Sequence, residues 1–196
     1  MAKTPEGESG VLLALLKNSE KEMSVSALAK LVGLSRMGAL LIVRKLEKEG
    51  MLTVRKVGRS SLCAVDLSSS HTRKYLTFLL SKEAEKASPY VRRWISELRR
   101  LKNAKAALLF GSVLRKERGA QDIDVLLITD QRHIAKLEAE IDALKRMNPK
   151  PIHPVYQSSA DFRRNLRKKD PVVLNAVKGI VAFGEEELYE PGSEQA

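Results

Sequence analysis

Hydrophobic positions in the first third of the chain recur with the period of an α-helix. Residues 11–17 predict one helix, and a second is predicted from Ser26 to Gly33. A third is predicted between Ser35, whose hydroxyl can accept hydrogen bonds from the first helical amides, and Gly50, which suits a left-handed C-cap. The residues predicted to form one buried face of this helix are Ala39, Ile42, Val43 and Leu46.

Two short strands are predicted after the third helix. They cover residues 52–56 and 61–65, around a turn that contains Gly58. Three helices followed by a β-hairpin resemble a winged helix-turn-helix domain of the MarR/ArsR kind, over residues 9–66. This resemblance implies a domain that binds duplex DNA and places its third helix in the major groove.

Residues 69–102 are predicted to form a helical connector. Tyr75, Phe78 and Leu79 mark one face of its first helix, and Pro89 ends that helix and begins a second. The second helix carries an apolar stripe that must be covered, either by the joined domains or by a second subunit. A homodimer is therefore one prediction. The stripe consists of Val91, Trp94, Ile95, Leu98 and Leu101.

After residue 103 the pattern changes to short apolar runs separated by amphipathic segments. This change predicts a small mixed sheet with helices between its strands. Strands are expected at residues 106–110, 123–128, 151–156 and 180–183. Helices are expected at residues 131–147, from Ser158 or Ser159 to Leu166, and from Pro171 to Lys178.

The predicted fold class is therefore α+β. The predicted parts are a winged helix-turn-helix domain at residues 1–68, the connector at 69–102 and the mixed-sheet domain at 103–190. The acidic segment from Glu185 onward is expected to fray, and residues 191–196 are predicted to be a disordered tail.

Two motifs of the mixed-sheet domain lie close together in the sequence. The strand 106–110 ends in Gly111 and Ser112, and the next strand opens with Asp122 and Asp124. Two carboxylates separated by one residue on a strand project to one face, where they can bind one or two Mg²⁺ ions. Gly111 lets the backbone approach a phosphate closely, and Ser112 is expected at a helix N-terminus that attracts anions.

These motifs, in this order, resemble the minimal nucleotidyltransferase domains of the DNA polymerase β superfamily. The resemblance implies that Mg²⁺ and a nucleoside triphosphate bind, and that a nucleoside monophosphate passes to a hydroxyl on a protein or small molecule. It implies that Ser112 orients the triphosphate and that Asp122 and Asp124 hold the metal. Arg115 and Lys116 are nearby cations that can neutralise phosphate charge.

A third carboxylate, which active members of the superfamily place on a later strand, is missing. The matching strand at residues 151–156 contains no acid. His153 is the candidate to replace it as a base or metal ligand, while Asp161 falls in the next helix and too far along the chain. Three hypotheses stay open: a DNA-binding transcriptional regulator whose mixed-sheet domain binds a nucleotide with or without transferring it, a nucleotidyltransferase whose winged helix serves for docking or dimerisation, and a catalytically inactive nucleotide-sensing or structural protein.

The charge pattern favours a polyanionic partner for the first half of the chain. The net charge is +11. Residues 1–102 contain 20 Lys and Arg against 10 Asp and Glu, whereas residues 103–196 contain 15 against 14. This asymmetry predicts a polyanionic partner, which the winged helix-turn-helix resemblance implies is double-stranded DNA. The residues predicted to contact it, mainly at phosphates, are Ser35, Arg36, Arg44, Lys45, Arg55, Lys56 and Arg59.

The outward residues of the third helix offer few groups that read bases. Four of the six predicted there lack a hydrogen-bonding side chain suited to base edges, which favours backbone contacts with modest sequence specificity. An apolar pair predicted to be exposed, Leu40 and Leu41, also permits an alternative in which the helix docks a protein. The six residues are Arg36, Met37, Gly38, Leu40, Leu41 and Arg44.

Features that would direct the chain to a membrane or an oxidising compartment are missing from the sequence. No apolar run approaches the roughly 20 residues needed to cross a bilayer, and residues 1–10 lack the apolar core of a signal peptide. The single cysteine, Cys63, cannot form an internal disulfide and is expected to be a small apolar residue in a strand. We therefore expect a cytoplasmic protein with no membrane partner.

Overall fold

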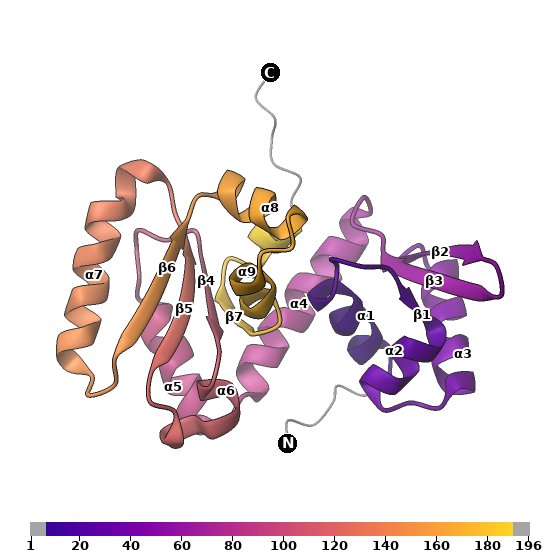
Figure 1. The fold of residues 1–196 in the computed structure, drawn as a ribbon, viewed down its shortest axis with the longest axis horizontal. Helices are drawn as coiled ribbons and strands as arrows, with labels where there is room; N and C mark the ends of the chain where they lie inside the picture. Colours follow the sequence, from indigo (N-terminus) through magenta and orange to yellow (C-terminus); the bar gives the residue numbers. More distant parts are fainter. Residues whose placement is uncertain (1–6, 190–196) are drawn as a thin grey trace. The chain divides into compact units, whose positions relative to one another are not determined.

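Two β-sheets organise the chain in the computed structural model, which describes residues 7–189. The chain divides between Leu79 and Leu80 into two units, each with helices and one sheet (Figure 1). The predicted α+β class is therefore confirmed at this level. The stretch expected to connect two domains is shared between the units, because its first helix, α4 (Ser70–Lys86), spans the division.

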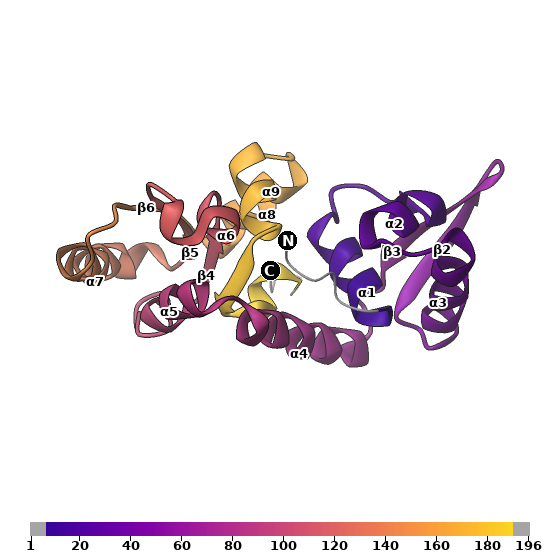
Figure 2. The same cartoon turned by 90° about the horizontal axis from the view of Figure 1, so that it is seen from below.

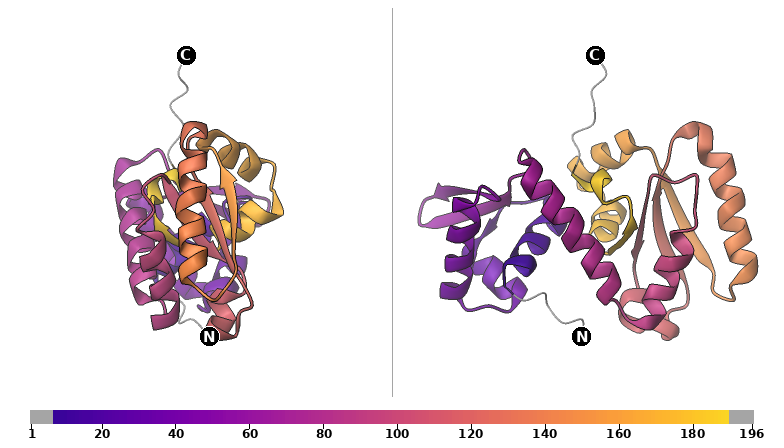
Figure 3. Two further views of the ribbon diagram at one scale, coloured as in Figure 1. Left: turned by 90° about the vertical axis from the view of Figure 1, so that its left-hand side faces the viewer. Right: turned by 180° about the vertical axis from the view of Figure 1, so that it is seen from behind.

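Unit 1, up to Leu79, contains a three-stranded antiparallel sheet in the order β1-β3-β2. The β2–β3 hairpin extends beyond the helices of this unit (Figures 2 and 3). The elements that precede α4 are α1 (Glu8–Lys17), β1 (Met23–Ser24), α2 (Val25–Val32), α3 (Arg36–Lys48), β2 (Leu52–Val57) and β3 (Ser60–Val65).

Serine caps and glycine turns set the boundaries of α2 and α3. The predicted cap of α3 is confirmed, since Gly38 N donates to Ser35 Oγ at 3.0 Å. The predicted start of α2 at Ser26 is wrong, because Ser24 caps the helix by accepting from Ala27 N at 3.2 Å. Gly33, with φ 72°, ends α2, and α3 then leaves at 110° to it.

The buried side of α3 follows the predicted period. Ala39, Val43 and Leu46 are buried, and Ile42 is half-buried. On β3, Cys63 is buried as expected, and burial raises the pKa of its thiol to about 11. Both observations place apolar side chains between the helices and the sheet of unit 1.

Unit 2 is built on a four-stranded sheet in the order β6-β5-β4-β7, in which only β5 and β6 run parallel. The strands are β4 (Ala106–Phe110), β5 (Ile123–Ile128), β6 (Ile152–Gln157) and β7 (Ile180–Phe183). The helices are α5 (Pro89–Leu98), α6 (Val113–Lys116), η1 (Glu117–Gly119), η2 (Gln131–His133), α7 (Ile134–Met147), α8 (Ser159–Arg167), α9 (Pro171–Val177) and η3 (Glu185–Leu188).

Helices cover both faces of this sheet. Figure 2 shows α5 and α7 on one side of it, and α8 and α9 on the other. Alternate residues of β4 and β5, such as Leu109 and Val125, pack with the buried stripe of α5 in one core. The stripe is therefore covered within unit 2, so the homodimer prediction loses the feature on which it was based. The stripe residues in this core are Val91, Trp94, Ile95, Leu98 and Leu101.

The predicted face of α4 is partly wrong. Phe78 is 55% exposed and stacks with Tyr75 at a ring-centroid distance of 6.3 Å. Leu79 is buried as predicted and Tyr75 is half-buried, while Leu76, one residue along from Tyr75, is also buried.

The segment after β7 is more ordered than the acidic composition predicts. Gly184 takes φ 77°, and a Cβ there would lie 2.2 Å from the carbonyl oxygen of Lys105. After this tight turn Leu188 and Tyr189 are buried, so fraying from Glu185 is wrong for residues 185–189. The predicted tail at residues 191–196 lies outside the described residues.

The described helices are too short or too polar to cross a bilayer individually. Between residues 7 and 189, no single helix combines the length and apolar composition needed to cross a membrane. The bent pair α2 and α3 meets the length and composition requirements only when the two helices are counted as one segment.

Candidate functional site

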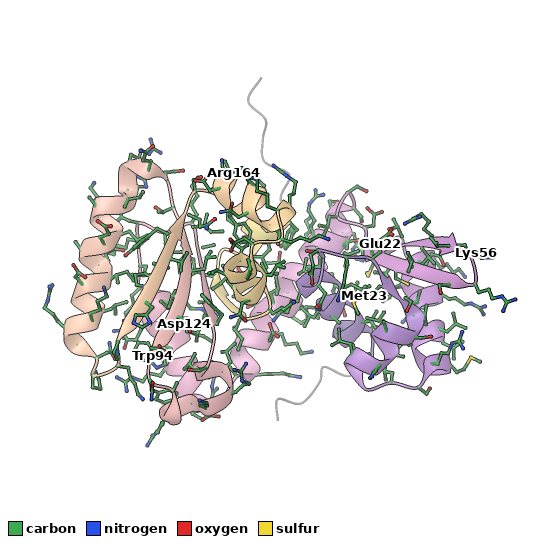
Figure 4. The ribbon with its side chains drawn as sticks, viewed as in Figure 1. Glu22, Met23, Lys56, Trp94, Asp124 and Arg164 are labelled. Atoms are coloured by element: carbon green, nitrogen blue, oxygen red, sulfur yellow. The ribbon has the colours of Figure 1, made fainter. Side chains whose placement is uncertain are left out.

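Three side chains with metal-ligating atoms meet at one end of β5 and β6. Asp122 precedes β5, Asp124 lies in β5, and His153 lies in β6. One ligand atom from each lies within 4.8 Å of the others. His153 Nδ1 is 3.5 Å from Asp122 Oδ2 and 3.9 Å from Asp124 Oδ1. Figure 4 labels Asp124 within unit 2.

The strand register explains this grouping. In the parallel β5–β6 pair Asp124 stands opposite His153, and Ile123 N donates to Pro151 O at 2.9 Å. Asp122 and Asp124, two residues apart, turn their side chains to the same side, as the sequence predicts. The pairing of β5 with β6 therefore brings His153 to the two acids. It occupies the position for which the sequence offers no third carboxylate.

Gly111 lies against the Asp124 carboxylate. The antiparallel β4–β5 register pairs Phe110 with Asp124, so the next residue, Gly111, reaches the same end of the sheet. Gly111 has φ 81°, and a Cβ there would lie 2.1 Å from Asp124 Oδ2. The glycine thus makes room for the carboxylate itself. From the sequence, this glycine is predicted only to let a phosphate approach the backbone.

The electrostatics of the cluster favour a bound cation. Burial raises the pKa of Asp124, the neighbouring Asp122 carboxylate raises it further, and His153 opposes the rise. Two carboxylates held this close repel one another, and a cation between them relieves that repulsion. The side chains are 36% exposed at Asp122, 30% at Asp124 and 60% at His153. A solvated ion can therefore reach all three.

Ser112 lies at the start of α6, where the sequence places it, but the helix is very short. Its carbonyl oxygen accepts from Arg115 N at 3.1 Å and from Lys116 N at 2.9 Å. Because α6 has four residues, its macrodipole contributes little to anion binding. The local amides and the Ser112 hydroxyl are the groups left for that role.

The cations near the site differ in what they contact. Arg115 and Lys116 are exposed and form no ion pair with other residues in the range 7–189. Lys150 donates from Nζ to the carbonyl oxygen of Arg118 at 2.9 Å and to that of Ala120. It therefore fastens the loop that leads to Asp122. Lys150 is not among the residues predicted for the site, because nothing in the sequence identifies the carbonyl groups that it contacts.

Asp161 belongs to a different local arrangement, as expected. Its Oδ2 accepts from the Ser158 hydroxyl at 2.7 Å, its backbone amide donates back to Ser158 Oγ, and Arg164 pairs with Oδ1. These contacts begin α8. They give Asp161 a structural role in α8, separate from the cluster of Asp122, Asp124 and His153.

The exposed surface of α3 differs from the prediction at one position. Met37 is 64% exposed and Leu41 is 58% exposed, whereas Leu40 is half-buried. The predicted apolar pair Leu40 and Leu41 is therefore wrong, because adjacent residues on a helix point about 100° apart. Met37 and Leu41, four residues apart, share the exposed face instead.

The residues predicted to contact DNA fall into two groups. Lys45 pairs with Glu8 at 2.6 Å, and that hydrogen bond raises the pKa of Lys45, while Arg55 pairs with Glu22 at 2.5 Å. The Ser35 hydroxyl is engaged as the α3 cap. The four that form no ion pair with any described residue are Arg36, Arg44, Lys56 and Arg59. Figure 4 shows Lys56 extending away from the β2–β3 hairpin.

The charge asymmetry is smaller when counted by structural unit. Residues 1–79 contain 13 Lys and Arg against 7 Asp and Glu, and residues 80–196 contain 22 against 17. The excess is thus +6 in one unit and +5 in the other. The contrast between the two halves came from assigning α5 and the end of α4 to the first half, so net charge alone does not single out unit 1.

Comparisons with known proteins give little further information. No family model matches the chain, and no curated protein matches it. Among solved structures, the chain is similar to the heme sensor protein PefR from Streptococcus agalactiae, crystallised in complex with heme. That likeness has a TM-score of 0.35 and 17% sequence identity, and covers 48% of this chain and 70% of that chain. A TM-score this low supports no argument about fold or function.

Proposed function

We propose that unit 2 is a nucleotidyltransferase-type domain that binds a divalent metal and a nucleoside triphosphate, and that unit 1 is a winged helix-turn-helix domain that binds duplex DNA. The observation that carries the proposal is the meeting of Asp122, Asp124 and His153 beside Gly111. Carboxylates on one side of a strand, next to a glycine turn, provide the donors that such a site requires.

The DNA-binding part is supported by the order and geometry of unit 1. Two helices at 110° joined by a short turn, followed by an extended hairpin, fit a helix-turn-helix with a wing. Four cations of α3 and the hairpin are available for phosphates. A transcriptional regulator is the function that this combination favours.

The residues of unit 2 fit the chemistry of nucleotide binding. A bound Mg²⁺ would hold and polarise the triphosphate oxygens. Asp122 and Asp124 supply the carboxylate oxygens that such an ion takes, and Gly111 leaves them room. Ser112 offers its hydroxyl and local amides, while Arg115 and Lys116 supply mobile positive charge. The donor set fits a divalent ion, with His153 in place of a third acid.

Transfer of a nucleoside monophosphate is the reaction that this arrangement would support. The oxygen of an acceptor hydroxyl would form a bond to the α-phosphorus as the bond to pyrophosphate breaks. His153, 60% exposed beside both acids, is the group available to take the proton of that hydroxyl. The acceptor would be a protein or a small molecule with an accessible hydroxyl.

Nucleotide binding without turnover is the second candidate function. It is favoured by one observation: the residue that stands opposite Asp124 on β6 is His153, so the cluster contains two carboxylates. In this case the nucleotide acts as an effector of the DNA-binding unit. We also propose a cytoplasmic protein, because its single cysteine, Cys63, is a free thiol.

Calorimetric titration tests the proposed site. Mg²⁺ with ATP, and then with each other nucleoside triphosphate, is added to the wild type and to the Asp122→Asn/Asp124→Asn variant. We expect binding to the wild type and none to the variant. Equal heats for both proteins, or none for either, contradict the proposal. The DNA-binding role of unit 1 is tested by measuring the affinity for a DNA duplex at several salt concentrations. A logarithm of affinity that does not change with the logarithm of salt concentration contradicts phosphate contacts.

A further inference from the structure

The cluster of Asp122, Asp124 and His153 in unit 2 carries a first inference, which rests on the proposed function. We propose that His153 makes this site prefer a later first-row metal ion, such as Co²⁺ or Zn²⁺, over Mg²⁺. Mg²⁺ takes oxygen ligands, whereas an imidazole nitrogen suits the later first-row metals. Two carboxylates and one imidazole therefore form a mixed donor set that a purely carboxylate site does not offer.

The distances from His153 Nδ1 to the two carboxylates favour a metal ion whose ligand atoms lie far apart from one another. Both distances from His153 Nδ1, 3.5 and 3.9 Å, exceed a normal hydrogen bond, so the imidazole is not held by either acid. Tetrahedral zinc ligands lie about 3.4 Å apart, given Zn–N and Zn–O distances near 2.1 Å. Octahedral Mg²⁺ requires neighbouring ligands about 2.9 Å apart. The two distances from His153 Nδ1 are therefore closer to the ligand spacing of a tetrahedral ion.

The positions of the ligands are fixed by the fold, while the imidazole keeps some freedom. Asp124 and His153 are opposed residues on paired strands, so their backbones are held by the sheet. The His153 side chain is 60% exposed and can rotate onto an ion. Three protein ligands leave further coordination positions for phosphate oxygens, as in metal sites that act on substrates.

Cobalt absorption spectroscopy tests this inference without measuring activity. Co²⁺ is titrated into the wild type, His153→Asp and the control His71→Gln, which changes an exposed histidine of unit 1. We expect a visible band for the wild type and the control, and Co²⁺ affinity lowered by about tenfold or more in His153→Asp. The same variant should bind Mg²⁺ more tightly than the wild type does, because it restores a carboxylate.

The outcomes separate the metal preference from the function on which it rests. Co²⁺ affinity within threefold of the wild type in His153→Asp, or a wild type that prefers Mg²⁺, overturns the preference. If Mg²⁺–ATP binding still depends on Asp122 and Asp124, the proposed function stands. Binding that is unaffected in Asp122→Asn/Asp124→Asn overturns both. Circular dichroism of each variant confirms that it is folded.

The exposed face of α3 carries a second, independent inference. Met37, Leu41, Arg44 and Lys48 follow one another at spacings of four, three and four residues, so they form one stripe on the helix. All four are exposed, with Met37 and Leu41 more than half so. The stripe is apolar in its first half and basic in its second. It lies opposite the buried residues Ala39, Val43 and Leu46.

We propose that Met37 and Leu41 contact the methyl groups of thymine in the major groove of DNA. This inference rests on the proposed DNA binding of unit 1. The 5-methyl group of thymine is the apolar group that base pairs present in that groove. The cations of the stripe, Arg44 and Lys48, form no ion pair with the described residues and suit phosphates. Their charge selects a polyanion, while the apolar pair selects the methyl groups.

Replacing thymine by uracil removes only the methyl group and therefore tests this contact. Binding to a duplex of alternating A·T pairs is compared with binding to the same duplex containing deoxyuridine. We expect the wild type to lose about fourfold in affinity for each buried methyl group. The Met37→Ala/Leu41→Ala variant should bind both duplexes equally and retain its salt dependence. Leu31→Ala, which removes an exposed leucine of α2, should behave as the wild type.

Two outcomes overturn the thymine contact. One is equal affinity of the wild type for the two duplexes, and the other is discrimination that survives in Met37→Ala/Leu41→Ala. Absence of binding to any duplex at low salt overturns the proposed DNA binding as well. Binding of an acidic helical peptide in that case would assign the stripe to a protein partner.

Discussion

Replacing Gly111 by alanine should abolish metal binding at a small cost in stability. A Cβ at this position lies 2.1 Å from Asp124 Oδ2 and 3.0 Å from Asp124 Cγ, against an ordinary contact distance of at least 3.4 Å. The carboxylate oxygen must therefore move by about 1.3 Å. Metal–ligand distances tolerate changes of only about 0.2 Å. Asp124 would then no longer share an ion with Asp122 and His153.

The stability cost comes mainly from the backbone. A left-handed alanine costs about 1–2 kcal/mol, and the φ of Gly111 is 81°. Gly33→Ala is the matched control, because Gly33 has φ 72° and no atom within 4 Å of the added Cβ. We expect both variants to lose a similar free energy of unfolding, since the half-buried Asp124 carboxylate can rotate away towards solvent. We expect only Gly111→Ala to lose metal affinity, by more than about tenfold, or 1.4 kcal/mol.

Urea unfolding and metal titration measure the two quantities separately. Metal affinity of Gly111→Ala within threefold of the wild type would refute the reasoning, because the contact with Asp124 would then have no effect. A destabilisation of more than about 4 kcal/mol would also refute it, since that size indicates damage to the core. Loss of metal binding in Gly33→Ala would show that the effect is not specific to the site.

Three further predictions follow from the contacts of individual side chains. Lys150→Met, which frees the loop before Asp122, should lower metal affinity by about tenfold in calorimetry; unchanged affinity would remove Lys150 from the site. Cys63 should resist thiol reagents at pH 8 until the protein is unfolded. The pKa of Cys63 is raised from its ordinary value of 9.0 to about 11 in the folded protein, so the free energy of unfolding should fall as pH rises from 9 to 11. The Cys63→Ala variant should not show this fall. A flat profile in both proteins contradicts the prediction. Arg44→Gln/Arg59→Gln should reduce the slope of DNA affinity against salt by about 2, whereas Lys45→Gln, which loses an ion-paired lysine, should change it less; equal changes would contradict the role given to ion pairing.

Local sequence patterns predict the sheet of unit 2 well. The bounds of β4, β5 and β7 agree with the predicted strands at every residue, because each is a run of four to six residues, apolar except for Asp124, flanked by turn-forming or polar residues. Pro171 begins α9 and Ser158 caps α8, as expected. These signals depend on neighbours in the chain, so the sequence contains them fully.

The features that the sequence could not predict depend on contacts between distant residues. His153 reaches the acids only through the parallel register of β5 and β6. Lys45 and Arg55 are paired with Glu8 and Glu22, more than 30 residues away along the chain. Lys150 acts through carbonyl groups, which no side-chain pattern reveals. The candidate acids were therefore predictable and His153 was a candidate beside them, whereas the contact of His153 with the acids and the role of Lys150 were not.

The most direct test of the central claim is a nuclear magnetic resonance titration that locates the bound nucleotide. Backbone amide shifts of the full chain are recorded as Mg²⁺ and a non-hydrolysable nucleoside triphosphate are added. The account predicts large changes at Gly111, Ser112 and Asp124 and at neighbouring residues of β6, all absent in Asp122→Asn/Asp124→Asn. Changes that lie elsewhere in the chain, or no changes at all, would contradict it.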